Sequence, residues 1–212
     1  SEPVAALPSL LQLYAQAVSA TPWRRWTLVG QSLGGTLAMA LADELRAQGH
    51  HVQSLVMIDS FHPEVMKTRS DRLLVDALGL QLPKALLPEI SVESAPDNVE
   101  GSTDSWIDNV YNYAAALKLV PVDLTLARIK RIYRVARANE HLAQQTQLPA
   151  NAPYPVLHIA AKDNTERAPA GWLERGMQFS FEEHTGNHET VMRGENAKGL
   201  IDIIRRFLQT IQ

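Results

Sequence analysis

The chain has 212 residues, of which 45% are hydrophobic and 20% charged, a balance sufficient for one globular domain with a buried core. Its net charge of −3 gives no indication of a nucleic-acid or membrane-surface partner. The absence of cysteine excludes disulfides, thiolate metal ligands and a thiol nucleophile. No apolar run approaches the roughly 20 residues of a membrane span, and no signal-peptide pattern is present, so we expect a cytoplasmic protein.

The first 60 residues predict a helix followed by a strand–helix–strand unit. Residues 4–20 carry apolar side chains at helical spacing, with Pro8 near the start and Thr21-Pro22 as the stop. A short strand then ends at Val29, and a second helix has one apolar face, formed by Leu33, Leu37, Ala40, Leu41 and Leu45. Gly49 ends this helix, and residues 52–58 form a buried strand. Short connections of this kind are typical of a parallel sheet.

The motif Gly30-x-Ser32-x-Gly34 lies where the first strand meets the second helix. A strand, a tight turn with serine at its apex and a helix together indicate a nucleophile elbow, whereas the five-residue motif alone could be an ordinary turn. We expect side chains at Gly30 and Gly34 to collide with the packed strand and helix. The turn would display the Ser32 hydroxyl and direct the backbone N–H of Leu33 toward a developing oxyanion.

The rest of the chain predicts a helical insertion and a return to the sheet. Prolines punctuate helical patterns over residues 60–153, which suggests an all-helical lid within one domain whose core is formed by residues 1–59 and 154–212. Residues 155–161 resume the sheet and end at Lys162-Asp163. A short helix around Trp172, a strand through 177–181 and a loop over 184–189 follow. The last helix has an apolar face formed by Leu200, Ile203, Ile204, Phe207 and Leu208.

A serine, an aspartate and a histidine, the three residue types of a catalytic triad, each follow a predicted strand. A serine hydroxyl becomes a good nucleophile when an imidazole accepts its proton and a carboxylate orients the imidazole. Ser32, Asp59 and His188 each follow a strand, at the sheet edge where ligands bind, and their order is that of α/β-hydrolases. Asp163 ends another strand and is the alternative acid. His184 shares the loop of His188, which we prefer because Gly186-Asn187 gives it a flexible approach.

Residues 28–38, 45–49 and 55–60 resemble the thioesterase domains that end non-ribosomal peptide and polyketide synthases, and residues 186–188 are similar to the histidine segment of that family. The resemblance implies an α/β-hydrolase fold, with a mostly parallel sheet and helices on both faces. It implies that an acyl or peptidyl chain passes from the phosphopantetheine thioester of a carrier protein to Ser32, and is released by water or by an internal amine or hydroxyl. No metal and no cofactor of its own are expected. In release domains the acid maps onto Asp59, and in stand-alone editing thioesterases it maps onto Asp163.

Two features depart from the family pattern. Gln31 stands where an aromatic residue or histidine is commoner, and only one helix precedes Trp26, where the family has several strands. We therefore expect the N-terminal strands of the fold, and the second oxyanion donor that they carry, to be absent from this sequence. The alternatives are an editing thioesterase, a generic carboxylesterase or acyltransferase of the same fold, and a catalytically silent interaction module.

Overall fold

The computed structural model describes residues 6–63, 107–108, 111–112, 114–116, 118, 120, 124–146, 152–164, 170–173 and 179–211. The chain divides into two compact units, one formed by Ser1–Pro3 and Arg69–Glu140 and the other by Val4–Thr68 and His141–Gln212. Most of the helical insertion predicted over residues 60–153 lies outside the described residues. Its all-helical character therefore stays a prediction.

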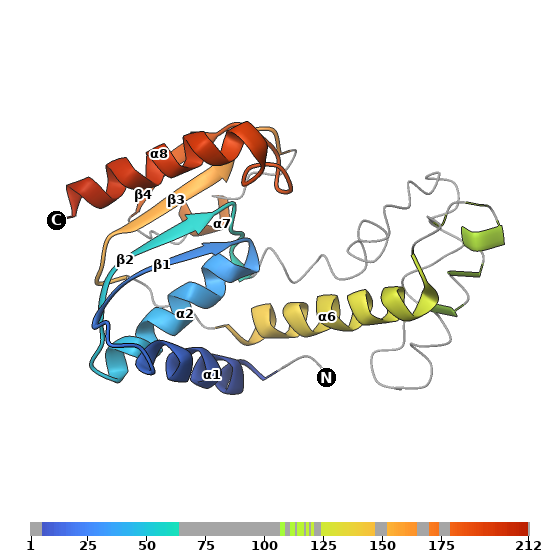
Figure 1. The fold of residues 1–212 in the computed structure, drawn as a ribbon, viewed down its shortest axis with the longest axis horizontal. Helices are drawn as coiled ribbons and strands as arrows, with labels where there is room; N and C mark the ends of the chain where they lie inside the picture. Colours follow the sequence, from blue (N-terminus) through green and yellow to red (C-terminus); the bar gives the residue numbers. More distant parts are fainter. Residues whose placement is uncertain are drawn as a thin grey trace. The chain divides into compact units, whose positions relative to one another are not determined.

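The second unit is built on a parallel sheet (Figure 1). The described strands are β1 (Arg25–Gln31), β2 (His51–Ile58), β3 (Val156–Ala161) and β4 (Ser180–His184), and they lie side by side in that order. Every neighbouring pair is parallel, which confirms the predicted parallel α/β architecture. The fourth strand begins later than the predicted 177–181, so His184 ends β4 and does not lie in the loop that follows.

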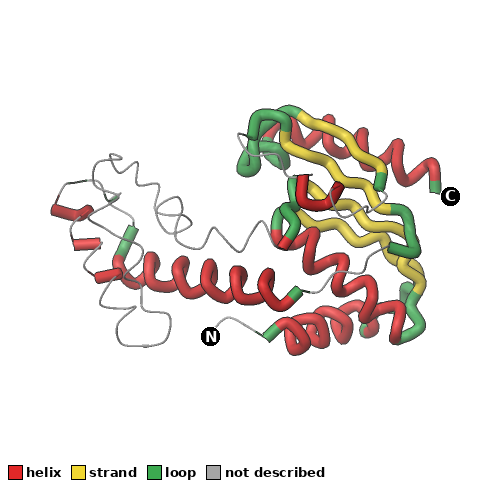
Figure 2. The backbone as a smooth tube through the Cα atoms, turned by 180° about the vertical axis from the view of Figure 1, so that it is seen from behind, coloured by secondary structure: helices red, strands yellow, loops and turns green. Residues whose placement is uncertain are grey.

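Helices cover both faces of this sheet (Figure 2). One face of β2 turns Leu55 and Met57 into a core shared with α1 (Leu7–Ser19) and α2 (Leu33–Ala47). The residues between them, Val56 and Ile58, pack on the other side with α8 (Gly194–Thr210). Alternate side chains of a strand point to opposite faces, so a strand segment covered on both sides is apolar on both faces, as β2 is from Leu55 to Ile58.

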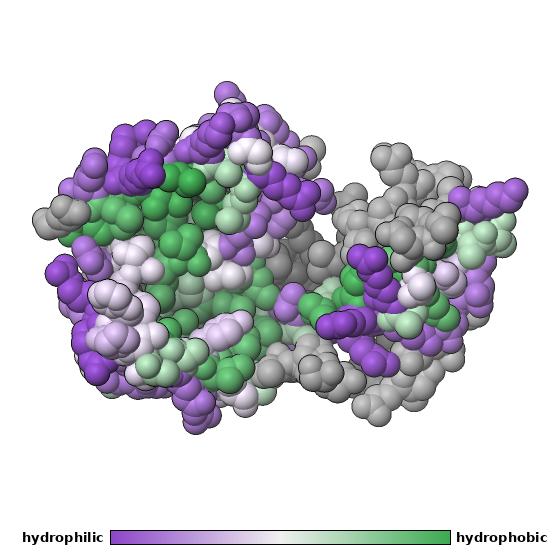
Figure 3. Space-filling view, viewed as in Figure 1, coloured by the Kyte–Doolittle hydropathy of each residue, from purple (hydrophilic) through white to green (hydrophobic). Residues whose placement is uncertain are grey.

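Helix α8 is held by the apolar stripe that its sequence predicts. Leu200, Ile203 and Phe207 are buried against the sheet. Its solvent side is hydrophilic (Figure 3) and carries the ion pairs Lys198–Glu195 and Arg205–Asp202. Burial of the stripe therefore fixes the C-terminal helix on the sheet, directly behind the loop that contains His188.

Two further helices complete the described elements. The short α7 (Ala170–Leu173) buries Trp172 completely in the core of the second unit. The long α6 (Leu126–Gln145) begins in the first unit, where Ile129 and Tyr133 pack in a small apolar cluster. Among the helices that the structure describes, none is both long and apolar enough to cross a membrane.

Candidate active site

The turn between β1 and α2 has a strained backbone at Ser32. This residue has φ 55° and ψ −129°, a conformation that is unfavourable for any residue other than glycine and costs roughly 1–3 kcal/mol. The Ser32 N–H donates to the carbonyl of Ile58 at 2.9 Å, and the Gly35 N–H donates to the Ser32 carbonyl at 3.1 Å. These bonds hold a sharp bend that leaves Ser32 half-buried at the C-terminal edge of the sheet.

Close packing at the bend, against backbone at Gly30 and against the Ser60 side chain at Gly35, explains two of its glycines. A Cβ on Gly30 would lie 2.2 Å from the carbonyl oxygen of Gly34, and one on Gly35 would lie 2.1 Å from Ser60 Oγ. A Cβ on Gly34 would meet nothing within 4 Å, so the expected collision at Gly34 is wrong. The backbone carbonyl of Gly34 forms the close approach, and this approach leaves no room for a side chain at position 30.

We expect Gly30→Ala to destabilise the domain by at least about 1–3 kcal/mol, because the clash is with backbone that cannot rotate away. Gly34→Ala, in the first turn of α2, should be neutral or stabilising by up to about 1 kcal/mol. Urea denaturation of the two variants measures both effects. Equal destabilisation by the two substitutions would contradict this account of the turn.

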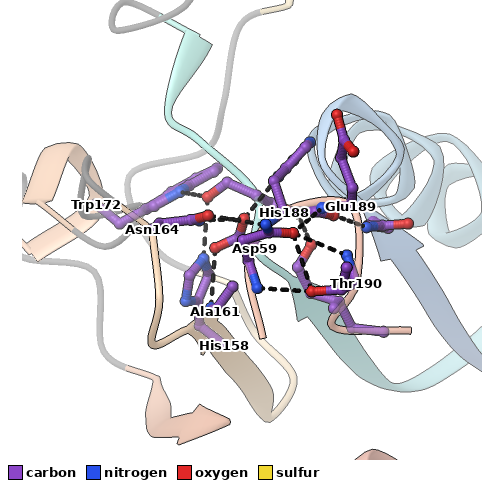
Figure 4. A network of polar contacts seen from close by, with 12 residues as sticks. Asp59, His158, Ala161, Asn164, Trp172, His188, Glu189 and Thr190 are labelled. Atoms are coloured by element: carbon purple, nitrogen blue, oxygen red, sulfur yellow. Dashed lines mark hydrogen bonds and ion pairs between the residues drawn. The ribbon is translucent and has the colours of Figure 1, made fainter. Parts of the chain in front are cut away.

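Asp59 and His188 are joined by a short hydrogen bond (Figure 4). His188 Nδ1 lies 2.6 Å from Asp59 Oδ2, and the carboxyl group belongs to a fully buried residue directly after β2. The same carboxylate accepts hydrogen bonds from the Ala161 N–H at 3.0 Å and from Asn164 Nδ2 at 2.6 Å. A carboxylate at Nδ1 fixes the tautomer that leaves Nε2 as a proton acceptor.

The Asp59 carboxyl is poised to remain ionised. Burial is the largest single influence and opposes the charge. The hydrogen bonds from His188, the Ala161 N–H and Asn164 together outweigh burial and lower the pKa of Asp59 below its usual value. The carboxylate can therefore stabilise a positive charge on the imidazole without taking the proton itself.

The alternative acid and the alternative base make other contacts. Asp163 is exposed and its Oδ2 accepts a hydrogen bond from the Gly186 N–H at 2.9 Å. His184 donates from Nε2 to the carbonyl of Asn196 at 2.7 Å, in the first turn of α8. The structure thus brings His188 to Asp59, and it uses Asp163 and His184 to fix the ends of the loop.

Ser32 lies at the same sheet edge as this pair. Within the described residues, no hydrogen bond joins its hydroxyl to the His188 imidazole, and such bonds are often loose in unliganded enzymes. The adjacent Gln31 donates from Nε2 to the His188 carbonyl at 2.7 Å. Leu33 begins α2 directly after Ser32, so its N–H belongs to the first turn, where backbone donors have no partner within the helix.

A comparison with protein families assigns the chain. The model of the thioesterase domain matches residues 1–208. The chain belongs to the thioesterase domain family. It is 26% identical to "Thioesterase pytI" of Aspergillus terreus over 239 residues, which cover 97% of the chain and 77% of that protein.

Parts of two longer proteins are also similar to this thioesterase domain. The enterobactin synthase component F of Escherichia coli K12 is 34% identical over 103 residues, covering 47% of the chain and 8% of that protein. The solved structure of holo-AB3403, a four-domain nonribosomal peptide synthetase bound to AMP and glycine, superposes with a TM-score of 0.68 at 23% identity. The alignment covers 96% of the chain and 16% of the synthetase, and at this identity it shows the fold alone.

The thioesterase domain holds a buried histidine beside the candidate site. His158, on β3, is fully buried. Its Nε2 donates to the carbonyl of Ser60 at 2.9 Å, and Trp172 Nε1 donates to the same oxygen at 2.8 Å. Burial lowers the pKa of His158, although the bond to Ser60 and the charge of Asp59 oppose the shift. Burial therefore favours the neutral form of this imidazole.

We expect the free energy of unfolding to fall as pH drops below about 6.5, the pKa of an unperturbed histidine. His158 has a lower pKa when folded, so the unfolded chain binds the proton first and is favoured in acid. This group adds a slope of at most about 1.4 kcal/mol per pH unit. Urea denaturation between pH 5 and pH 8 measures the slope, and His158→Gln should reduce it. An unchanged slope in that variant would contradict the assignment.

The sequence did not single out Gln31 or Asn164 as site residues, although both touch His188. The Asn164 side chain bridges the Asp59 carboxylate and the backbone N–H of His188. The available signal for Asn164 was its position as a polar residue just after a strand. Asp163, one residue earlier, has the same signal, so the pattern could not distinguish the two. Among the described residues, no group of three or more His, Cys, Asp or Glu side chains could hold a metal ion.

Proposed function

We propose that this domain is a serine thioesterase that releases an acyl or peptidyl chain from the phosphopantetheine thioester of a carrier protein. The observation that carries the proposal is the 2.6 Å bond between His188 Nδ1 and the buried Asp59 carboxylate, beside the strained turn of Ser32. Membership of the thioesterase family supplies the reaction class.

In this proposal the first half-reaction forms an acyl-enzyme. Ser32 Oγ attacks the thioester carbonyl while His188 Nε2 takes the hydroxyl proton, and the Asp59 carboxylate stabilises the imidazolium. The Leu33 N–H donates to the oxyanion of the tetrahedral intermediate. The C–S bond then breaks, the pantetheine thiol leaves with the proton from His188, and the acyl group remains on Ser32 as an ester.

The second half-reaction frees the chain. Water, or an amine or hydroxyl of the bound chain, attacks the ester carbonyl while His188 again accepts a proton. Breakdown of the intermediate returns this proton to Ser32 Oγ and restores the free enzyme. Attack by water gives an acid, and attack from within the chain gives a macrocycle.

A carrier protein as partner is supported by the relatives. Of the two longer proteins, one is a component of enterobactin synthase and the other is a nonribosomal peptide synthetase, and this chain matches 8% and 16% of their lengths. The matched part of each protein is small, so we extend to this chain only the carrier-bound thioester as a substrate class, and none of the other activities of those proteins. The exclusion of nucleic acid and of cofactors stays a prediction from the sequence.

Kinetics of the purified full-length protein with two acyl donors test this function. One donor is an acyl chain loaded on a carrier protein as the phosphopantetheine thioester, and the other is the p-nitrophenyl ester of the same acid. We expect kcat/KM to be higher for the carrier-bound thioester, and the mass of the product distinguishes acid from macrocycle. Turnover of the soluble ester alone would instead assign a generic esterase.

A further inference from the structure

We infer that Gln31 and Asn164 act as positioning residues that hold the backbone of His188, an arrangement that we name the amide clamp. The inference rests on the proposed function, because the clamp would set where the imidazole lies relative to Ser32 and Asp59. Its two members come from different elements: Gln31 ends β1, and Asn164 follows β3.

Asn164 holds both the acid and the base. Its Oδ1 accepts the His188 N–H at 2.8 Å, and its Nδ2 donates to Asp59 Oδ2 at 2.6 Å. The chemistry fixes this orientation of the amide, because an N–H group needs an acceptor and a carboxylate needs a donor. One side chain therefore sets the distance between the Asp59 carboxylate and the His188 backbone.

Gln31 holds the backbone carbonyl of His188. Its Nε2 donates to the His188 carbonyl at 2.7 Å, and a carbonyl can only accept. Gln31 directly precedes Ser32, so this bond ties the candidate nucleophile to the loop of the base. Both backbone polar groups of His188 are thus bonded to side chains from distant parts of the sequence.

The loop needs such a constraint. Gly186 has φ 104°, and His188 leaves the sheet in a segment with no strand or helix partner for its backbone. The other hydrogen bonds of the loop do not involve His188: Gly186 bonds to Asp163, and the Asn187 side chain accepts from the N–H groups of Glu189 and Thr190. Local bonds shape the turn, whereas only contacts to β1 and to the end of β3 can place it against Ser32 and Asp59.

Removing either clamp residue should therefore reduce kcat with little change in KM. A displacement of about 1 Å in a catalytic group can lower the rate by about 10²-fold, and we expect up to that loss for Asn164→Ala. Gln31→Ala should give a smaller loss, about 10-fold, since Asn164 still holds His188. Gln31→Glu preserves the size of the side chain but cannot donate to the His188 carbonyl, so it should behave as Gln31→Ala does.

Asn164→Asp separates positioning from general stability. It keeps an oxygen for the His188 N–H and places a second carboxylate against Asp59. Two carboxyl groups this close share one proton, so one of them has a strongly raised pKa, and its ionisation should add a step to the kcat/KM pH profile that the wild type lacks. Asn164→Ala adds no titrating group and should not add this step. A residue that served folding alone would not produce this difference.

The experiment uses the full-length protein, the variants Gln31→Ala, Gln31→Glu, Asn164→Ala and Asn164→Asp, and Gln53→Ala as the matched control. Gln53 also donates from Nε2 to a backbone carbonyl, that of Ile211 at 3.5 Å, at the opposite end of the sheet. Two measurements are made: steady-state kinetics with the carrier-bound thioester, and the low-field proton NMR signal of the His188 Nδ1–H. Thermal melting shows which variants are folded. If an alanine variant does not fold, the size-matched variants Gln31→Glu and Asn164→Asp replace it in the test.

We expect the low-field signal in the wild type and in Gln53→Ala, and its loss or broadening in folded clamp variants together with the fall in kcat. Retention of the signal and of wild-type kcat in folded Gln31 and Asn164 variants would overturn the clamp. The NMR signal needs no substrate. If the wild type shows no thioesterase activity, the proposed function fails, and the signal alone still decides whether the clamp holds His188.

Discussion

Ser32→Ala is expected to lower kcat for the carrier-bound thioester by about 10⁴–10⁶-fold, the range seen when the nucleophile of a serine hydrolase is removed. Without the hydroxyl no acyl-enzyme can form, and the imidazole of His188 has no proton to accept. The strained turn should be retained, because its bonds from the Ser32 N–H and to the Ser32 carbonyl involve backbone atoms only. Steady-state kinetics with thermal melting as a folding check measure the effect.

A serine far from the site is the matched control for this substitution. Ser19 closes α1, and its hydroxyl bonds to His50 at 2.9 Å on an exposed surface. Ser19→Ala should retain wild-type kcat. A Ser32→Ala protein that is folded and keeps more than about one tenth of wild-type kcat would show that another group carries the chemistry.

Asp59→Asn is expected to lower kcat by about 10⁴-fold, the loss found when the triad aspartate of a serine protease is replaced by asparagine. The amide can present a donor to His188 Nδ1, which favours the tautomer with its proton on Nε2. That tautomer cannot accept the proton of Ser32. The charge that stabilises the imidazolium is lost as well. Kinetics at a fixed pH between 7 and 8 measure the fall.

Asp163→Asn is the paired variant that tests the choice of acid. Its amide oxygen can still accept the Gly186 N–H that Asp163 Oδ2 accepts at 2.9 Å. We therefore expect a loss of less than about 10-fold, since a single neutral hydrogen bond contributes only about 0.5–1.5 kcal/mol. The reverse ranking, with the greater loss at Asp163, would assign that carboxylate to His188 and contradict the geometry described above.

The sequence predicts the sheet core well because its apolar patterns are strong. The run from Leu55 to Ile58 is apolar on both faces, and such a strand fits a parallel sheet covered by helices. The weaker pattern near β4 placed the strand too early. Phe181 is 40% exposed and Phe179 is only partly buried, so the aromatic residues there do not mark a buried face.

The sequence limits the acid of the candidate site to two carboxylates but does not distinguish between them. Asp59 and Asp163 both follow a strand at the same edge, and local pattern cannot say which carboxylate turns toward the imidazole. The hydrogen bonds show it, because Asp59 bonds to His188 and Asp163 bonds to Gly186. The roles of Gln31 and Asn164 were equally hidden, since an amide gains its function only from the groups that the fold brings to it.

Reaction of the full-length protein with a fluorophosphonate, followed by peptide mass mapping of the adduct, tests the central claim most directly. The proposed chemistry predicts one covalent adduct, on Ser32, which Ser32→Ala abolishes and Asp59→Asn slows strongly. Absence of an adduct on Ser32 in the folded wild type, or equal labelling of the wild type and Asp59→Asn, would contradict a nucleophile activated by His188 and Asp59.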